Sequence, residues 1–287
     1  MGRLMKWTPI EKDVLSELYL VQELSAQKIA KMVGAKVYQI DYLLDKYEIP
    51  RRTLSVANRK YSVNHSYFKQ IDDCEKAYWL GFLYADGFVT AGNYVGLSLA
   101  VTDKKHVEKF REAIRSTHPI HIYKTNGYAN TEYARLAFAS QEMTRDLENL
   151  GCFQHKTLLL KFPTEQQVPH QFLKDFVRRY IDGDGSITTG GKNSPLRLRV
   201  CGTRELLEGL KIYFNTILAP DSISNKLEKR HKDTKNNYAL SLGSARKSLL
   251  ILHELYDGAS VFLDRKNDLY LLKKAQLQSS LPEMVGV

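Results

Sequence analysis

The chain has 287 residues, of which 43% are hydrophobic, and a formal net charge of +10 at pH 7. This length can hold two or three domains with buried cores. No signal-peptide pattern or membrane-spanning apolar run is present, which argues against a membrane protein and favours a location in the cytoplasm, at the nucleoid or in an organelle. The basic excess favours a nucleic-acid partner.

The first 52 residues have the pattern of a small helical domain. Thr8 and Pro9 predict the start of a first helix, as a cap and a first-turn proline. A second short helix follows Ser25 and ends at Gly34, and a third spans about residues 37 to 47. Together they resemble a helix-turn-helix DNA-binding module, although a three-helix unit for protein contact has the same pattern.

The third helix would enter the DNA major groove in such a module. Its candidate groove contacts are Lys36, Tyr38 and Gln39, with Asp41 on the same exposed side. A basic linker is expected over residues 53–74, and Arg51 and Arg52 just before it are candidates for contact with DNA phosphates. Such contacts fix position along the DNA and carry no sequence information.

Two segments further along look like copies of one helix-ending signature: WLGFLYADG at 79–87 and VRRYIDGDG at 177–185. Each places an acid before its last glycine, and Asp184 follows Asp86 by 98 residues (184 − 86). Gly87 and Gly185 predict helix stops in the left-handed conformation. Because the helix dipole is negative at a C-terminus, two such acids brought together require a cation, and a divalent metal fits that need.

The elements expected after each signature follow the same order. The first half predicts a short strand between Gly87 and a turn at Gly92-Asn93, then strands at 94–102, 120–125 and 132–139 and helices at 104–116 and 141–150, with a second turn at Asn126-Gly127. The second half predicts strands at 186–189, 196–200, 223–230 and 238–242 and helices at 204–217, 245–256 and 264–277, with a turn at Gly190-Gly191. Each half therefore predicts a four-stranded antiparallel sheet with helices on one face.

These residues resemble the LAGLIDADG homing endonucleases in their single-chain form with two motifs. Gly81, Ala85, Asp86 and Gly87 match the motif in the first copy; Ile181, Asp182, Asp184 and Gly185 match it in the second. The resemblance implies an α+β fold of two pseudo-symmetric αββαββα repeats, at residues 75–165 and 166–280, whose sheets form a saddle. The helix-turn-helix domain, residues 1–52, precedes them.

The resemblance also implies a site and an activity. The two motif helices would pack side by side and hold Mg²⁺, with Mn²⁺ substituting and Ca²⁺ allowing binding without cleavage. One phosphodiester would be hydrolysed in each DNA strand, leaving 5′ phosphates and short 3′ overhangs. The implied metal ligands are Asp86, Asp184 and the carbonyls of Ala85 and Gly183, and the implied basic catalytic residues are Lys156 and Lys266.

The open sheet face gathers basic side chains. Arg197 and Arg199 alternate with apolar residues along one predicted strand, so they point away from the core. Such a face suits the DNA major groove, which admits a two-stranded ribbon. The candidate contacts on the sheets are Arg135, Arg197, Arg199, Lys226 and Arg230. The expected partner is double-stranded DNA with a long asymmetric site, bound by a monomer.

The second motif departs from the family pattern. Asp175 and Arg179 stand where the first copy has Ala77 and Gly81, and their spacing of four predicts a pair along the helix. The bulk of Arg179 is expected to splay the two motif helices at their start. Two other functions stay open: a DNA-binding transcriptional regulator that uses this scaffold without cutting, and an intron maturase.

Overall fold

The computed structural model describes residues 9–22, 24–51, 60–125, 131–189, 196–224, 226–230 and 235–280. Its contacts divide the chain into two units, Met1–Tyr61 and Ser62–Val287. The four-part division expected from the sequence stays a prediction. In the described part, no helix combines the length and the apolar character that crossing a membrane requires.

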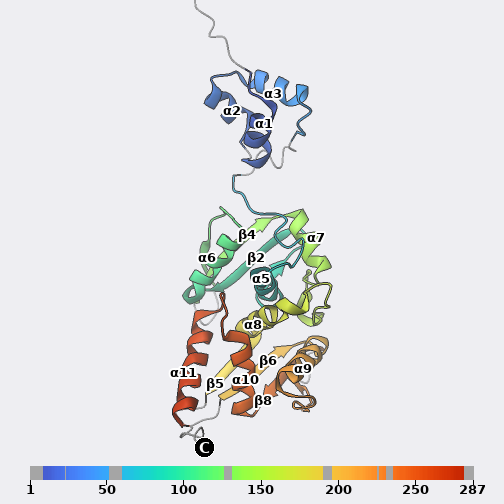
Figure 1. The fold of residues 1–287 in the computed structure, drawn as a ribbon, viewed down its shortest axis with the longest axis vertical. Helices are drawn as coiled ribbons and strands as arrows, with labels where there is room; N and C mark the ends of the chain where they lie inside the picture. The colour runs from blue at the N-terminus through green and yellow to red at the C-terminus, as the bar shows by residue number, and fades with distance from the viewer. Residues whose placement is uncertain are drawn as a thin grey trace, which may run out of the picture. The chain divides into compact units, whose positions relative to one another are not determined.

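The first unit is a small helical domain (Figure 1). Helix α1 (Lys12–Ser16) continues as the π-helical turn η1 (Glu17–Val21), followed by α2 (Ala26–Val33) and α3 (Val37–Lys46). Ser25 caps α2 as expected, since its hydroxyl accepts a hydrogen bond from the Lys28 backbone at 3.2 Å. Gly34 ends α2 in the left-handed conformation, with φ of +69°.

The start of the first helix differs from the prediction. Glu11, in an extended conformation, is the N-cap residue of α1, so the helix begins at Lys12 and not at Pro9. Thr8 lies outside the described residues. The core of this unit matches the helical periodicity, because Leu15, Ile29 and Ile40 are completely buried.

The second unit contains the repeat predicted from the sequence. The first half consists of α5 (Cys74–Ala85), β1 (Gly87–Val89), β2 (Tyr94–Ala100), η2 (Val101–Asp103), α6 (Lys104–Ala113), β3 (His121–Lys124), β4 (Glu132–Ala139), α7 (Gln141–Asn149) and η3 (Lys156–Leu158). The second consists of η4 (His170–Phe172), α8 (Leu173–Asp184), β5 (Gly185–Thr189), β6 (Leu196–Gly202), α9 (Arg204–Leu218), β7 (Glu228–Lys229), β8 (Tyr238–Leu242), α10 (Ala245–Tyr256) and α11 (Asp264–Ser280).

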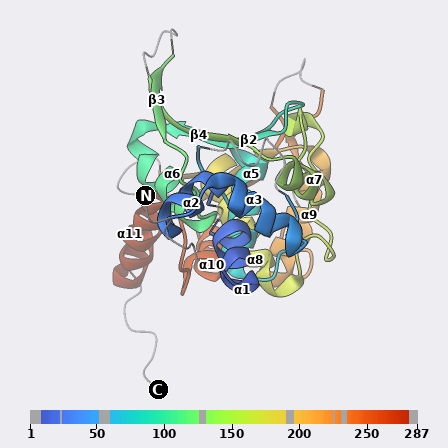
Figure 2. The ribbon, with the colours of Figure 1, turned by 90° about the horizontal axis from the view of Figure 1, so that it is seen from above.

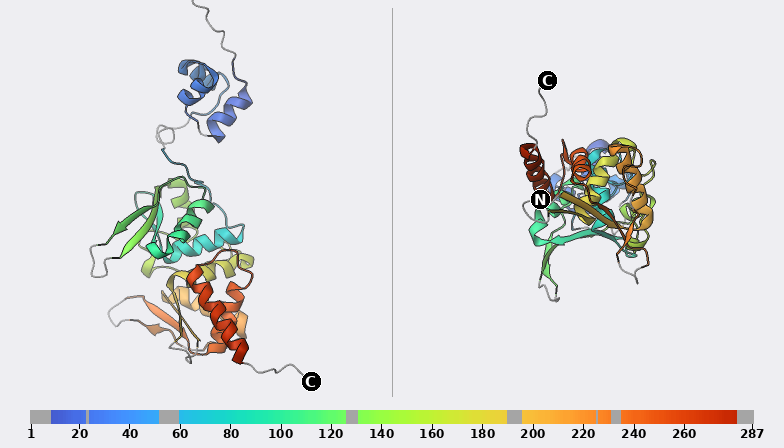
Figure 3. Two further views of the ribbon diagram at one scale, coloured as in Figure 1. Left: turned by 90° about the vertical axis from the view of Figure 1, so that its left-hand side faces the viewer. Right: turned by 90° about the horizontal axis from the view of Figure 1, so that it is seen from below.

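The two sheets have the same topology. Their strand orders are β1-β2-β4-β3 and β5-β6-β8-β7, and the strand pairs are antiparallel. Helices cover one face of each sheet and leave the other open (Figures 2 and 3). Strand β6 shows why: Leu196, Leu198 and Val200 are buried while the arginines between them are exposed. The α+β fold of two αββαββα repeats is confirmed.

Some strand ends differ from the prediction. Strand β2 stops at Ala100, because a 3₁₀ turn at Val101–Asp103 leads into α6. Strand β7 is reduced to Glu228–Lys229, where the sequence predicted a strand over 223–230. The two predicted glycine turns, Asn126-Gly127 and Gly190-Gly191, lie outside the described residues.

Helices α5 and α8 pack against each other at the centre of the second unit (Figure 1). A Cβ atom built on Gly81 would lie 2.5 Å from the Phe176 carbonyl oxygen and 3.2 Å from the Arg179 Cβ. The helices are therefore close at this level, and the expected splaying by Arg179 is wrong. Because Gly81 has no side chain, it leaves the space that the larger residue fills.

The glycines after the acids do not act as left-handed helix stops. Gly185 is extended, with φ of −85° and ψ of 147°, and both Gly87 and Gly185 begin strands. A Cβ at Gly87 would lie 2.6 Å from the Leu83 Cα, and one at Gly185 would lie 2.5 Å from the Ile181 carbonyl oxygen. Glycine is required here because each strand turns back against the helix that precedes it.

Candidate functional site

The two motif acids stand where the motif helices end together. Asp86 is the C-cap residue of α5, and Asp184 is the last residue of α8. A Cβ on Gly183 would lie 2.4 Å from the Ala85 Cβ and 2.8 Å from Asp86 Oδ2. The structure thus brings together the four residues implied as metal ligands, since the ends of both helices touch at Ala85 and Gly183.

The acids are electrostatically unlike. Burial, reinforced by the negative charge of Asp86, raises the pKa of Asp184 to about 6, against the opposing effects of a hydrogen bond from Tyr180 and the charges of Arg179 and Lys266. Asp86 is more open, with 33% of its side chain exposed. Two neighbouring carboxylates at negative helix ends favour a positive charge between them.

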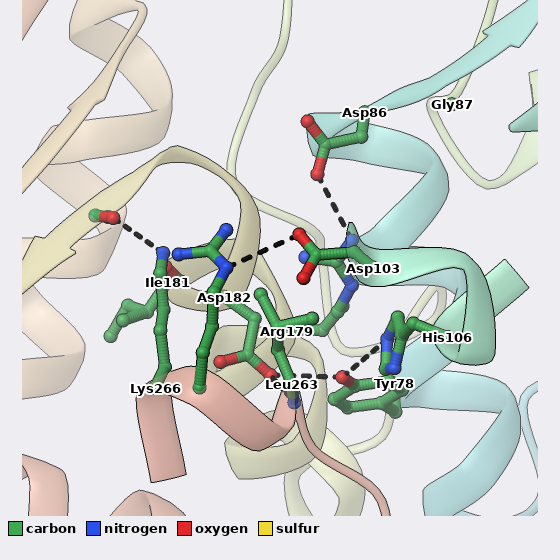
Figure 4. A network of polar contacts seen from close by, with 12 residues as sticks. Tyr78, Asp86, Gly87, Asp103, His106, Arg179, Ile181, Asp182, Leu263 and Lys266 are labelled. Atoms are coloured by element: carbon green, nitrogen blue, oxygen red, sulfur yellow. Dashed lines mark hydrogen bonds and ion pairs between the residues drawn. The ribbon is translucent and has the colours of Figure 1, made fainter. Parts of the chain in front are cut away.

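Arg179 supplies one such charge. Its Nη2 donates a hydrogen bond to Asp86 Oδ2 at 3.1 Å (Figure 4). Its guanidinium lies over the Phe82 ring. The pair expected between Asp175 and Arg179 is wrong. Asp175 instead binds Arg178 at 2.7 Å, because the Arg179 side chain crosses to the other motif helix.

The two candidate lysines occupy equivalent places. Lys156 donates a hydrogen bond to the carbonyl oxygen of Gly87. Lys266 donates two hydrogen bonds of 2.6 Å, one to the carbonyl oxygen of Gly185 and one to that of Ile181. Both are buried, with exposed fractions of 8% and 6%. Burial lowers the pKa of Lys266 to about 8. Each ammonium group thus lies beside the glycine that follows a motif acid.

Sequence reasoning missed the role of Asp182, which it used only as a motif match. This carboxylate is 1% exposed and accepts hydrogen bonds from the Tyr78 hydroxyl at 2.9 Å, the Tyr256 hydroxyl and the Leu263 backbone at 2.9 Å. The Tyr78 hydroxyl also contacts the His106 ring at 3.0 Å (Figure 4). The network ties α8 to α5, α6, α10 and the segment before α11.

A cavity of about 130 Å³ opens beside Asp184. It is large enough for several water molecules. Both repeats contribute to its wall, and Arg230 and Asn237 bring polar groups from the second half. Its lining consists of Tyr84, Ala85, Thr157, Leu160, Tyr180, Asp184, Cys201, Gly202, Arg230 and Asn237.

The donor set is consistent with a hard divalent cation. Magnesium is commonly held by one or two carboxylates and takes its other oxygen ligands from water and phosphate. The Asp86–Asp184 pair and the adjacent cavity fit this pattern. Within the described ranges, no cluster of three or more histidine, cysteine, aspartate or glutamate side chains is placed to hold a metal.

The candidate DNA contacts on the sheets lie on exposed positions. Arg135 in β4 and Arg197 and Arg199 in β6 point to the open faces, and Lys226 and Arg230 flank the short strand β7. Arg135 stacks over the Phe88 ring, with its Cζ 4.6 Å from the ring centre. Arg199 is partly neutralised, since it lies 3.3 Å from Glu228.

In the first unit, Lys36 and Tyr38 are exposed at the start of α3, and Tyr38 reaches 70% exposure. The side chain of Gln39 accepts a hydrogen bond from the Lys36 backbone at 2.8 Å. Arg51 is held by Asp41 at 2.6 Å and Asp45 at 2.9 Å, so part of its charge is neutralised within this unit. Arg52 lies outside the described residues.

Comparison with known proteins gives similarity at the level of structure. No family model and no curated protein matches the chain. The homing endonuclease I-WcaI bound to its DNA recognition sequence is 12% identical, with a TM-score of 0.46 over 70% of this chain and 90% of that one. The LAGLIDADG homing endonuclease I-GzeII in complex with its DNA target is 11% identical, with a TM-score of 0.46 over 71% and 92%.

The N-terminal LAGLIDADG domain of DUF199/WhiA is also similar, at 14% identity and a TM-score of 0.39 over 77% of this chain and 98% of that one. These solved structures are LAGLIDADG proteins, the family that the two motifs resemble. At these identities the likeness concerns the fold, and the activity of this chain is a separate question.

Proposed function

We propose that this chain is a LAGLIDADG-type endonuclease that binds double-stranded DNA and hydrolyses one phosphodiester in each strand with a divalent metal. The observation that carries the proposal is the meeting of Asp86 and Asp184 at the ends of two packed helices, beneath two sheets with open faces. One chain holds both halves, so a monomer is sufficient for two cuts. The two cuts leave 5′ phosphates and short 3′ overhangs.

The proposed DNA surface is the open face of the two sheets. Arginines on such a face bind phosphates and can donate two hydrogen bonds to guanine in the major groove. The two sheets differ in sequence: Ser98 pairs with Arg135 in the first, and Arg199 pairs with Ser241 in the second. A pseudo-symmetric protein with unlike halves would therefore recognise a long asymmetric site.

At the centre, Asp86 and Asp184, with the nearby backbone of Ala85 and Gly183, would hold Mg²⁺ or Mn²⁺. Such an ion, when bound, supplies Lewis-acid stabilisation of the charge that develops on the phosphate. The protein fixes the two carboxylates on rigid helix ends, so that they need no rearrangement during the reaction. Lys156 and Lys266 add positive charge beside each acid.

The helices α2 and α3 would act as a helix-turn-helix, with α3 in a major groove of the same DNA. Lys36, Tyr38 and Gln39 are the candidate base contacts, and Arg51 and Arg52 are candidates for phosphate contact. Added to the sheets, this module lengthens the recognised sequence.

The test is cleavage of a randomised double-stranded DNA library in Mg²⁺ or Ca²⁺ by the wild type, Asp86→Asn and Asp184→Asn. We expect magnesium-dependent double-strand cuts that each variant abolishes or reduces to nicks, while calcium supports binding alone. Products sequenced at both ends give the site and the overhang. The proposal that the protein is a nuclease would be contradicted if the folded wild type binds specific DNA but does not cut it in the presence of any metal tested.

One observation favours a second candidate. Because Arg179 already neutralises Asp86, the acids could be kept without metal in a sequence-specific DNA-binding regulator. Specific binding with no cutting in Mg²⁺ or Mn²⁺, and affinity unchanged in Asp86→Asn, is the result expected for that function.

A further inference from the structure

The two halves of the central site differ in one positively charged side chain, Arg179. Arg179 belongs to the second motif but its guanidinium binds Asp86 of the first, with 3.1 Å between Nη2 and Oδ2. The residue equivalent to Arg179 in the first motif is Gly81, 98 residues earlier (179 − 81). No corresponding arginine therefore reaches Asp184 from the first motif helix.

Two glycines make room for this ion pair. Gly81 lies opposite Arg179, and a Cβ there would be 3.2 Å from the Arg179 Cβ. A Cβ on Gly183 would be 2.8 Å from Asp86 Oδ2 and 3.1 Å from Arg179 Nη1. The first motif has Ala85 at the position of Gly183. The two repeats therefore differ at the two glycine positions, Gly81 and Gly183, that leave room for the Arg179 guanidinium.

Arg179 is held less firmly than its neighbour on the same helix. Arg178 donates to the Val261 and Leu255 carbonyls and to Asp175, so each of its three guanidinium nitrogens has a partner. Arg179 is just as buried, yet its Nε and Nη1 have no hydrogen-bond partner among the residues that the structure describes. One hydrogen bond and the Phe82 ring hold it, which suits a side chain that can move.

We propose that Arg179 is an internal counter-ion for Asp86 that a divalent cation must displace, so that the two acids bind metal unequally. The inference rests on the proposed function, since it concerns the same pair of carboxylates. In the metal-free protein, the guanidinium relieves the repulsion between the acids. The Asp86 oxygen that bonds to Arg179 is also the one that faces Gly183 of the other motif helix. A cation bound between the two acids would therefore exchange a hydrogen bond of this oxygen for a coordination bond, which weakens binding on that side.

The experiment measures Mn²⁺ binding to the full-length protein by electron paramagnetic resonance, without DNA, together with thermal unfolding. The variants are Arg179→Met, Arg179→Gln and the control Lys174→Met, which removes an exposed cation from the same helix. We expect both Arg179 variants to bind Mn²⁺ at least tenfold more tightly than wild type, and Lys174→Met to change little. Without metal, both Arg179 variants should unfold at a lower temperature than the control.

Cleavage order gives a second readout. If Asp86 is the weaker side, the wild type accumulates DNA nicked in one particular strand at low Mn²⁺, and Arg179→Met accumulates less of it. Equal or weaker Mn²⁺ binding in the folded Arg179 variants would overturn the counter-ion role, even where the wild type cuts DNA. Absence of Mn²⁺ binding and of cleavage in every folded protein would overturn the endonuclease as well. Arg179→Gln provides the comparison if Arg179→Met does not fold.

Discussion

Lys156 and Lys266 occupy equivalent positions in the two halves of the second unit. The ammonium group of each donates a hydrogen bond to the carbonyl of the glycine that follows a motif acid, Gly87 in one half and Gly185 in the other. Both side chains are buried. Lysine is rarely buried without a partner, and these carbonyl groups are the partners. The symmetry of the contacts argues for a shared role that a chance surface lysine would not have.

The first prediction concerns these lysines. Lys156→Met or Lys266→Met should slow cleavage by about tenfold or more, because each removes a positive charge beside one acid. DNA binding in Ca²⁺ should be retained. Each variant should also lose about 1–3 kcal/mol of unfolding free energy, since a buried carbonyl loses its donor. Strand-specific cleavage rates and urea titrations measure the two effects. Lys161→Met, an exposed lysine on the same connection, is the control, and equal loss in it would contradict a specific role.

The second prediction concerns the packing of α5 on α8. Gly81→Ala should destabilise the second unit by about 1–3 kcal/mol, because the new methyl group would meet the Phe176 carbonyl oxygen, a backbone atom that cannot rotate away. The matched control is Gly243→Ala, where a Cβ has nothing within 4 Å. Denaturant unfolding of both variants tests this, and equal stability would show that the helices can separate at no cost.

Local patterns predicted much of this fold. Strand β4 and helix α10 have the predicted bounds, because a helix-capping serine marks one end of each. Ser140 follows β4 and caps α7, and Ser244 caps α10. The alternation of arginine with apolar residues in β6 likewise fixed which side chains are exposed. That Asp86 and Asp184 would meet was implied by the family resemblance of the two motifs and could not be predicted from local pattern.

Long-range contacts could not be predicted in this way. Tyr78 and Asp182 are 104 residues apart, and their hydrogen bond depends on the final helix packing. Spacing of four residues suggested that Arg179 pairs with Asp175, but side-chain direction is set by the neighbouring helix, which has a glycine at the contact. Helical periodicity predicts which face of the helix a residue lies on, but it does not predict which residue its side chain contacts.

The third prediction concerns pH. Burial, with the positive charges of Arg179, Lys109 and Arg265, lowers the pKa of His106 to about 2, so the ring stays neutral in the folded protein. An unfolded histidine takes up a proton below about pH 6.5. The unfolded state therefore binds more protons below that pH, and stability should fall as the pH drops from about 6.5 towards 2, by up to about 1.4 kcal/mol per pH unit.

His106→Gln removes this contribution, so the variant should lose less stability than wild type between pH 6.5 and 4.5. The quantity to measure is the difference in unfolding free energy between wild type and variant at each pH. The difference is needed because Asp184 acts in the opposite direction and stabilises the folded protein as the pH falls. Its raised pKa makes the folded state bind the extra proton between its ordinary pKa of 3.8 and about 6. Parallel curves for the two proteins would show that His106 does not remain neutral.

The fourth prediction concerns the first unit. Its core and that of the second unit are separate clusters, one formed by residues from Ile10 to Ile49 and the other from Val63 onward. A chain starting at Ser62 should therefore fold, with the central site intact. DNA binding should weaken by about tenfold or more and depend less steeply on salt, because the phosphate contacts of the first unit are lost.

Cleavage at saturating protein should stay close to the wild-type rate, since Asp86, Asp184 and both lysines remain. Binding titrations at several salt concentrations, followed by cleavage at saturation, separate affinity from chemistry. The variant Tyr38→Ala in the full chain is the matched control for the role of α3: it should reproduce part of the loss in affinity, because Tyr38 is exposed and its removal disturbs no core. A truncated protein that folds and binds DNA but does not cut would mean that the first unit contributes to the reaction itself.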